Sequence, residues 1–238
     1  MADRPYTLLS CGMSIDGYLD SAGPSRLRLS NEADFDRVDA VRARCDAILV
    51  GAATVRSDDP RLLVRSAARR AERVASGRPP SPAKVTLTRR GDLSPTAAFF
   101  TAGDSDRLVY CPTGAAGELR QRLGGAATVV DTGARGDIPV RTISEDLSAR
   151  GVDRLMVEGG GTVLTQFLTA DLADELHLVV APLFVGDSRA PRLVGDGCFP
   201  WHAGRRAPLV GVRQIGDVVL LRYALSDRFS DEPPDGER

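Results

Sequence analysis

The segment Arg154-Leu-Met-Val-Glu-Gly-Gly-Gly-Thr-Val-Leu-Thr-Gln-Phe-Leu168 contains the signals that decide the fold. Its first apolar residues are typical of the end of a buried strand, and the later ones recur at helical spacing. Between them stand a carboxylate, Glu158, and three glycines. Unpaired N–H groups and the helix dipole make such a junction an anion site, where glycines let a phosphate approach the backbone. The segment predicts a phosphate or nucleotide site, although a tight structural turn has the same pattern.

The composition is that of an ordinary globular protein. The chain has 238 residues, of which 42% are hydrophobic and 26% charged, and its net charge is −1. We predict a single domain over residues 1–225 and a polar, disordered tail over 226–238. A balanced charge and the lack of a bilayer-spanning apolar run predict a cytoplasmic protein that binds neither nucleic acid nor membrane. The four widely spaced cysteines suggest neither a metal site nor a disulfide framework.

Strand and helix signals alternate along most of the chain. Residues 6–13 and 47–50 are expected to be strands, and Asn31 is expected to cap a helix between them. Further strands are expected at 85–87, 108–110, 128–130 and 175–185, and helices at 119–123 and 143–149. Residues 208–212 and 218–225 predict a hairpin. The expected fold is α/β, with a mostly parallel sheet flanked by helices and an antiparallel hairpin at its C-terminal edge.

Two more polar blocks adjoin predicted strands. Gly12-Met-Ser-Ile-Asp-Gly17 ends the first strand and by itself is typical of an Asp-Gly turn. Thr54-Val-Arg-Ser-Asp-Asp-Pro-Arg-Leu-Leu-Val-Arg65 follows the second strand and by itself is compatible with a capped helix and a solvated turn. Because the carboxyl ends of parallel strands meet at one edge of a sheet, where open α/β sheets bind ligands, the three blocks together predict one shared site.

The most specific pieces, Thr54-Val-x-x-Asp58-Asp-Pro-x-Leu62 and Glu158-Gly-Gly-Gly, resemble the riboflavin-biosynthesis pyrimidine reductases. This family comprises the reductase half of bacterial bifunctional deaminase–reductases and the stand-alone diaminopyrimidine reductases of archaea and fungi. The resemblance covers about residues 6–225, and the zinc signature of the deaminase half is absent. It implies a dihydrofolate-reductase-like fold, a homodimer, and hydride transfer from NADPH to C1′ of a ribosylamino-pyrimidine 5′-phosphate. We expect residues 176–185 to serve the dimer interface.

The resemblance also implies roles for particular residues, with Asp58 and Glu158 as the catalytic pair. The implied NADPH contacts are Gly12, Thr54, Asp58, Gly159, Gly160, Gly161 and Thr162. The implied substrate contacts are Arg28, Arg42, Leu62, Arg65 and Glu158. Arginine forks suit a sugar phosphate, and Arg89 and Arg90 would suit the 2′-phosphate of NADPH, unless they form a solvated basic loop. The proton donor stays open between Asp58, Asp16 and water.

Some positions depart from the family pattern. Tyr18 follows Asp16-Gly17, where members of the riboflavin pathway commonly carry Lys or Arg. NADPH-dependent reduction is therefore a firmer prediction than any particular pyrimidine substrate. A second hypothesis keeps the fold and the cofactor but takes a pterin, a folate-like compound or a modified nucleoside as substrate. A third is a non-catalytic nucleotide-binding protein.

Overall fold

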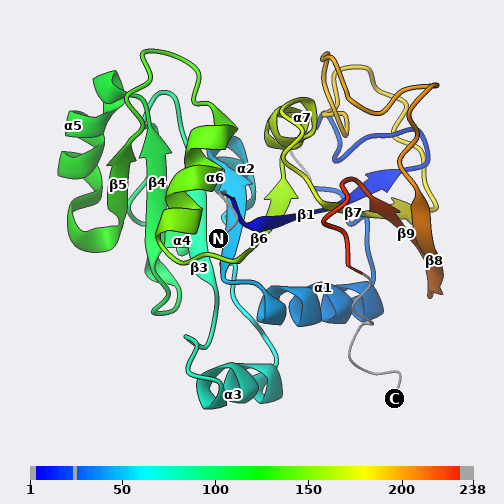
Figure 1. Ribbon diagram of the computed structural model, residues 1–238, viewed down its shortest axis with the longest axis horizontal. Coiled ribbons are helices and arrows are strands. Elements are labelled where there is room, and N and C mark those ends of the chain that lie inside the picture. Colours follow the sequence, from blue (N-terminus) through cyan, green and yellow to red (C-terminus); the bar gives the residue numbers. More distant parts are fainter. Residues whose placement is uncertain (1–3, 24–25, 231–238) are drawn as a thin grey trace.

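The computed structural model describes residues 4–23 and 26–230, and over these residues nine strands form one sheet (Figure 1). The strands are β1 Tyr6–Ser14, β2 Ala47–Gly51, β3 Ala83–Leu87, β4 Arg107–Cys111, β5 Thr128–Asp131, β6 Arg154–Gly159, β7 Glu175–Ala181, β8 Leu209–Ile215 and β9 Val218–Ala224. Their order is β5-β4-β3-β2-β6-β1-β7-β9-β8. All pairs from β5 to β7 are parallel, and β9 pairs antiparallel with β7 and β8. The predicted mostly parallel sheet with a C-terminal antiparallel hairpin is confirmed.

The helices connect the parallel strands. They are α1 Glu32–Arg44, α2 Ala52–Asp58, α3 Ala67–Ala75, α4 Ala98–Thr101, α5 Thr113–Leu123, α6 Val140–Ala149 and α7 Gly161–Thr169, with a 3-10 turn, η1, at Gly124–Ala126. Asn31 caps α1 as predicted, since its side chain accepts a hydrogen bond from the backbone N–H of Asp34. The expected helix at 119–123 begins earlier, at Thr113, because Ala and Gly residues give its first turns little apolar signal.

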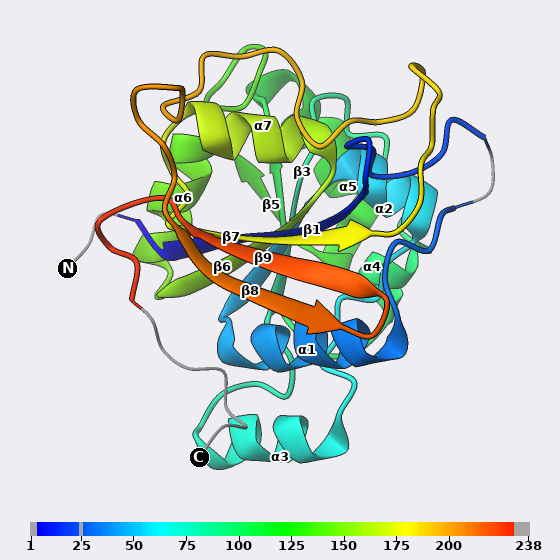
Figure 2. The ribbon, with the colours of Figure 1, turned by 90° about the vertical axis from the view of Figure 1, so that its right-hand side faces the viewer.

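Helices cover both faces of the sheet, so that the central strands are buried on two sides. On one face, Ile143 of α6 and Phe167 of α7 pack against the sheet. On the other face, Val55 of α2 and Leu119 of α5 do so, with α1 beside them. Figure 2 shows α7 and α1 on opposite sides of the strands. All five residues of β2 are buried, as the continuous apolar run predicted.

Three adjacent parallel strands, β2, β6 and β1, carry the three polar blocks of the sequence at or just beyond their carboxyl ends. Val157 of β6 is in register with Leu9 of β1 on one side and with Leu49 of β2 on the other. The blocks therefore come together at one edge of the sheet, as predicted. The predicted convergence is confirmed by this strand order.

Two expectations about the C-terminal part differ from the structure. The strand expected at 175–185 ends at Ala181, before Pro182, because proline has no N–H for the ladder. The first residues of the expected disordered tail make contacts: the Ser226 hydroxyl donates to Asp174 Oδ1 at 2.5 Å. Residues 231–238 of that tail lie outside the described residues. Within the described ranges, no helix is long and apolar enough to cross a membrane.

Candidate active site

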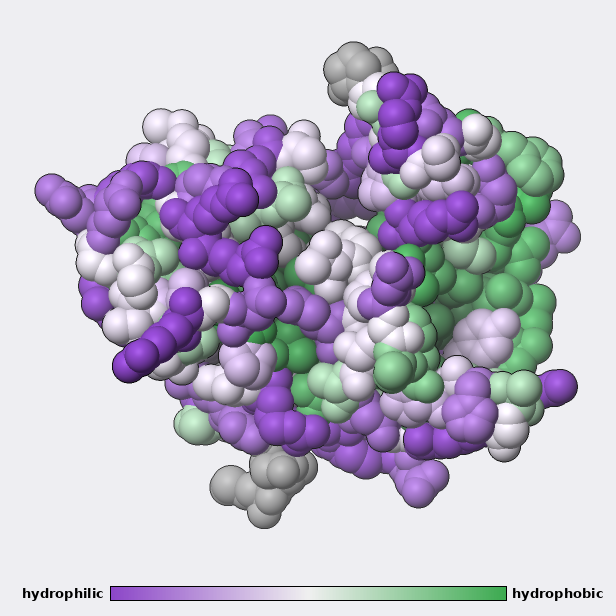
Figure 3. Space-filling view, turned by 90° about the horizontal axis from the view of Figure 1, so that it is seen from above, coloured by the Kyte–Doolittle hydropathy of each residue, from purple (hydrophilic) through white to green (hydrophobic). Residues whose placement is uncertain are grey.

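A cleft of about 1660 Å³ lies at the carboxyl ends of β1, β2 and β6. Seen from above, the molecule is hollowed there, with polar side chains around the rim and apolar ones visible in the depth (Figure 3). The structure brings most of the predicted site residues together in it. Those that line the cleft are Gly12, Arg28, Arg42, Thr54, Asp58, Arg89, Arg90, Glu158, Gly159, Gly160, Gly161 and Thr162.

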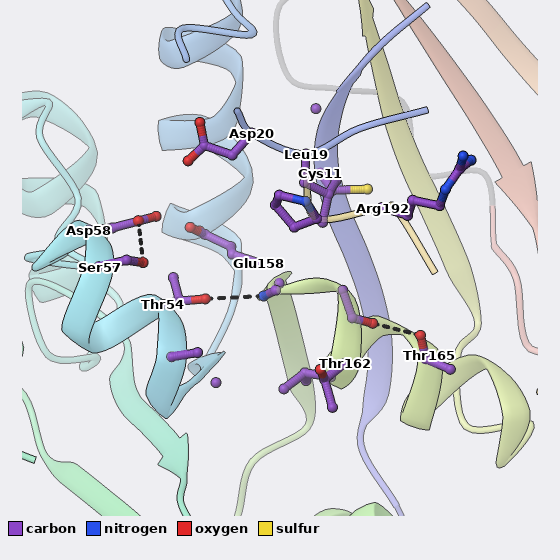
Figure 4. Close-up of a pocket in the computed structure, with 18 of the residues that line it drawn as sticks. Cys11, Leu19, Asp20, Thr54, Ser57, Asp58, Glu158, Thr162, Thr165 and Arg192 are labelled. Atoms are coloured by element: carbon purple, nitrogen blue, oxygen red, sulfur yellow. Dashed lines mark hydrogen bonds between the residues drawn. The ribbon is translucent and has the colours of Figure 1, made fainter. Parts of the chain in front are cut away.

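The glycine loop joins β6 to α7 and contacts α2 across the cleft. The Gly160 N–H donates to Thr54 Oγ1 at 3.2 Å, an interaction drawn in Figure 4. Gly159 has a φ of 111°, which a residue with a side chain rarely adopts. A Cβ on Gly161 would collide with the backbone oxygen of Arg192, which lies in the loop above α7. The loop thus requires glycine at both positions, and it leaves the first N–H groups of α7 at the cleft.

Glu158 is held by Arg42, which reaches it from α1. Arg42 Nε donates to Glu158 Oε1 at 2.6 Å and Nη2 donates to Oε2 at 2.5 Å. Both side chains are largely buried, at 18% and 14% exposure. Burial by itself lowers the pKa of Arg42, but the ion pair with Glu158 outweighs it and leaves that pKa above its usual value. The resemblance implied that the Arg42 guanidinium contacts the substrate. In the structure the guanidinium binds Glu158 instead and fixes the direction of that carboxylate.

Asp58 is the last residue of α2 and lies on the wall of the cleft across from β1. Its carboxylate accepts a hydrogen bond from the Ser57 hydroxyl at 2.7 Å and pairs with Arg26 at 3.2 Å. Figure 4 shows Asp58 and Glu158 beside the same cleft, one from α2 and one from β6. The two carboxylates expected to act together thus share one cavity.

Asp16, the other carboxyl group considered for the proton, does not line this cleft. Its carboxylate accepts hydrogen bonds from Ser14 Oγ at 2.5 Å and from the backbone N–H groups of Val185 and Gly186. These bonds, that from Ser14 first, lower the pKa of Asp16 to about 2. An ionised carboxylate with these partners holds the loop after β7 in place. Of the two carboxyl groups considered for the proton, only Asp58 lines the cleft.

Two predicted substrate contacts do not line the cleft. Leu62 is 2% exposed and packs in the core beneath α2. The guanidinium of Arg65 donates to the backbone oxygen of Phe35 at 3.0 Å and lies over the Phe35 ring, 5.5 Å from its centroid. The chain turns away from the site after α2, with left-handed backbone at Asp59 and again at Leu62. A continuous motif in the sequence is therefore split in space.

The structure adds cleft residues that the sequence analysis did not single out. Ser10 of β1 and Asp34 and Arg37 of α1 line the part of the cleft between these two elements, which we call its floor. Asp34 and Arg37 are three residues apart and therefore share one face of the helix that Asn31 caps. That spacing is a sequence signal that could have indicated both residues. A smaller hollow of about 400 Å³ adjoins Arg89 and Arg90 and adds Arg135. Arg89 pairs with Asp137 at 2.8 Å in that hollow.

A glycine loop before a helix, two carboxylates in one cleft and a mostly parallel sheet define an α/β protein suited to a phosphate-bearing ligand and acid–base chemistry. Comparison with known families makes this specific. The model of the RibD C-terminal domain matches residues 5–221, and the chain belongs to this family. It is thus an oxidoreductase of the RibD type, with the dihydrofolate-reductase-like fold that the sequence predicted.

Similar proteins span nearly the whole chain. A 2,5-diamino-6-ribosylamino-4(3H)-pyrimidinone 5′-phosphate reductase of Archaeoglobus fulgidus is 35% identical over 95% of this chain and 99% of its own. The Methanothermobacter thermautotrophicus reductase of the same name is 33% identical over 93% and 99%. A RibD structure from Acinetobacter baumannii has a TM-score of 0.75 at 27% identity, and the match covers 94% of this chain and 58% of that one.

Proposed function

We propose that this protein is an NADPH-dependent reductase of 2,5-diamino-6-ribosylamino-4(3H)-pyrimidinone 5′-phosphate. The reaction would reduce C1′ of the ribosylamino group and yield the ribitylamino product. The supporting observation is one cleft that holds Glu158, Asp58 and the glycine loop, in a chain similar to the two archaeal reductases over almost their whole length. The diaminopyrimidinone is favoured over the uracil analogue because both of these relatives carry its name.

The residues present fit a dinucleotide. Gly160, Gly161 and the first turn of α7 line the cleft at a helix N-terminus, and they would hold the diphosphate. Arg89, Arg90 and Arg135 line the adjoining hollow and would hold the 2′-phosphate that distinguishes NADPH from NADH. When bound, the cofactor supplies the hydride, and the protein supplies binding and orientation.

The substrate is assigned to the other side of the cleft, between β1 and α1. The carboxylate of Glu158, held by Arg42, would accept hydrogen bonds from amino or ring N–H groups of the pyrimidinone. Asp58 stands on the opposite wall, and we assign it the proton that is needed as the sugar ring opens. Arg28, near the mouth of the cleft, is 59% exposed and would contact the sugar phosphate.

A direct assay separates the candidate functions. The purified protein would be given the diaminopyrimidinone phosphate, its uracil analogue and dihydrofolate in turn, and NADPH absorbance would be followed. We expect turnover with the diaminopyrimidinone phosphate. Preference for dihydrofolate would support a folate-like substrate instead. NADPH binding without any turnover would support a non-catalytic nucleotide-binding protein.

We further propose a cytoplasmic homodimer, but with a different contact from the one expected at 176–185. Strand β7 is hydrogen-bonded to β1 and to β9, so neither of its edges is open. The open edge at this end of the sheet is β8, where Leu209 is 53% and Val212 61% exposed. An exposed apolar edge strand favours pairing with another chain, and a second copy of this protein is the partner we propose.

A further inference from the structure

Arg37 lies at the floor of the cleft, between α1 and the sheet, and its side chain is only 12% exposed. Its Nε donates to Asp34 Oδ1 at 2.6 Å, and its Nη1 lies 3.2 Å from His177 Nδ1. In the described part of the chain, Arg37 Nη2 has no hydrogen-bond partner. The guanidinium is thus anchored on two sides and keeps donors available to a ligand.

The partners of His177 decide its protonation. A guanidinium can only donate, so His177 Nδ1 must accept from Arg37, and its proton resides on Nε2. That N–H donates to Glu175 Oε1 at 2.7 Å. Arg222 also approaches Nε2 at 3.3 Å, but its Nε and Nη2 have a better acceptor in Glu175. Burial lowers the pKa of His177, which agrees with a neutral ring.

Ser10 is a second polar residue on this floor whose hydroxyl could contact a ligand. It lies beside His177 in the register of β1 and β7, lines the cleft and is only 6% exposed. Across the described residues, its hydroxyl has no hydrogen-bond partner in the protein and is not one of the fully buried unpaired atoms, so it is open to the cleft. A hydroxyl that lines the same cleft as the open donors of Arg37 can donate to, or accept from, a ligand bound there.

The surrounding charges select the part of the ligand that fits. The two carboxylates that border the floor, Asp34 and Glu158, are each paired with an arginine, so these two pairs leave no excess positive charge to bind a phosphate dianion. A heterocycle with N–H and amino donors beside a carbonyl acceptor matches the mixture of groups, because the carboxylate of Glu158 accepts and Arg37 donates. The floor is therefore suited to the base of the substrate, and the phosphate belongs nearer the arginines of the rim.

We propose that Arg37 is a substrate-binding residue that donates a hydrogen bond to the carbonyl oxygen of the pyrimidinone, and that His177 is the positioning residue that holds the Arg37 guanidinium in the cleft. The identity of the heterocycle rests on the proposed function. The position of the guanidinium rests on Asp34 and His177, which hold it from two sides. His177 itself does not line the cleft and acts through Arg37.

A matched pair of variants tests this arrangement. In His177→Asn the side-chain oxygen stands near the position of Nδ1 and can accept from Arg37. In His177→Gln the amide reaches the position of Nε2, beside Glu175, and the acceptor for Arg37 is lost. The probe is the free triaminopyrimidinone base, whose binding is measured by calorimetry, with ribose 5-phosphate as the comparison ligand and thermal unfolding as the check on folding.

We expect His177→Gln and Arg37→Gln to weaken binding of the base about tenfold, the usual effect of losing one hydrogen bond to a charged group. His177→Asn should bind within about threefold of the original protein, since it keeps the acceptor. Ribose 5-phosphate should bind all of them alike. In turnover assays the KM for the whole substrate should rise in His177→Gln, with kcat changed far less.

The outcomes separate this proposal from the proposed function. Base binding that follows this pattern supports the role of Arg37 and His177 even if the diaminopyrimidinone phosphate is not reduced. Equal base binding in all variants, or no binding of the base to the original protein, overturns it even if reduction occurs. Equal weakening in His177→Asn and His177→Gln would show that His177 is merely structural.

Discussion

Strand β6 and the side chain of Arg42 together fix the position of Glu158 in the cleft. Two charge-assisted hydrogen bonds from α1 hold the carboxylate, and both partners are largely removed from water. Such a pair is costly to break by removing one member, because the other charge is then left buried and alone. A substitution that keeps the shape of the side chain is therefore a fairer test of function than truncation to alanine.

Glu158→Gln should lower kcat/KM for the diaminopyrimidinone phosphate about a hundredfold. The amide keeps the size of the carboxylate but loses its charge and one acceptor, and a hydrogen bond to a charged group contributes roughly 1.5–3 kcal/mol. Steady-state kinetics would measure this, with thermal unfolding alongside. The control is Glu145→Gln, an exposed glutamate of α6 outside the cleft. Near-original activity in Glu158→Gln would remove this residue from the site.

The basic residues beside the smaller hollow carry the proposed preference for NADPH. Arg90→Gln and Arg135→Gln should each raise the KM for NADPH about tenfold and leave the KM for NADH nearly unchanged, because only NADPH has the 2′-phosphate. Arg141→Gln, an exposed position outside both hollows, is the control. Equal effects on the two cofactors would show that the 2′-phosphate does not bind there.

At the scale of elements, the junction of β6 and α7 depends on the long loop between β7 and β8. The backbone oxygen of Arg192, in that loop, lies directly against Gly161. Nearby, Gly195 N–H donates to Thr165 Oγ1 at 2.9 Å, so the loop is also attached to α7 by a hydrogen bond. The same loop contributes Pro191 and Arg192 to the wall of the cleft. The start of α7 is thus fitted to a segment distant in sequence.

Gly161→Ala should destabilise the protein by about 1–3 kcal/mol, since the new methyl group must displace backbone. It should also weaken NADPH binding, because the displaced loop lines the cleft. Gly117→Ala in α5 has open space around its Cβ and should be neutral or stabilising by about 0.5–1 kcal/mol. Urea unfolding and cofactor titration would measure both variants. A Gly161→Ala protein of unchanged stability would mean that the loop does not press on α7.

The proposed homodimer contact is at the open edge of the sheet, along β8. Val212→Lys places a charge on an exposed apolar position and should shift the protein from dimer to monomer. Light scattering after gel filtration would report the mass. Val74→Lys, at another exposed apolar position on α3, should leave the mass unchanged. A monomeric original protein would contradict the dimer, and a dimeric Val212→Lys would place the contact elsewhere.

At the scale of the whole molecule, a buried charged cluster joins the sheet to α1. Glu175 is 2% exposed and accepts hydrogen bonds from His177, Arg222 and Tyr6. Although burial raises the pKa of Glu175, these partners, His177 foremost, lower it from 4.5 to about 2. A carboxylate whose pKa is lower in the folded state stabilises the protein above its unfolded pKa, and the gain is lost as the pH falls through the folded value.

The free energy of unfolding should therefore fall between about pH 5 and pH 2, with Glu175 contributing on the order of 3 kcal/mol. Asp174, whose pKa is also lowered, should add to the slope. Urea unfolding across this range would measure it. Glu175→Gln should be less stable at neutral pH and show a flatter acid slope, whereas Glu145→Gln should keep the original slope. Identical slopes in all three proteins would contradict the role of Glu175.

Much of the fold was predictable because its signals are local. The apolar run of β2, the cap at Asn31 and the glycine loop after Glu158 each depend on residues close together in the chain. The common edge of the three blocks was also predictable, since parallel strands place their carboxyl ends together. The helix at α5 was placed too short because its Ala and Gly residues carry little pattern.

The sequence by itself determined the class of fold, the glycine loop and the places of Asp58 and Glu158 beside strand ends, because local spacing sets strands, helices and turns. Only the tertiary structure decided where the arginines lie relative to the cleft and which partners hold them. Arg65 leaves the cleft where the backbone turns left-handed, Arg42 is engaged with Glu158, and Arg37 is placed by a histidine 140 residues away. The direction of a long side chain depends on its hydrogen-bond and ion-pair partners. Where these partners are distant in sequence, no short-range sequence pattern identifies them.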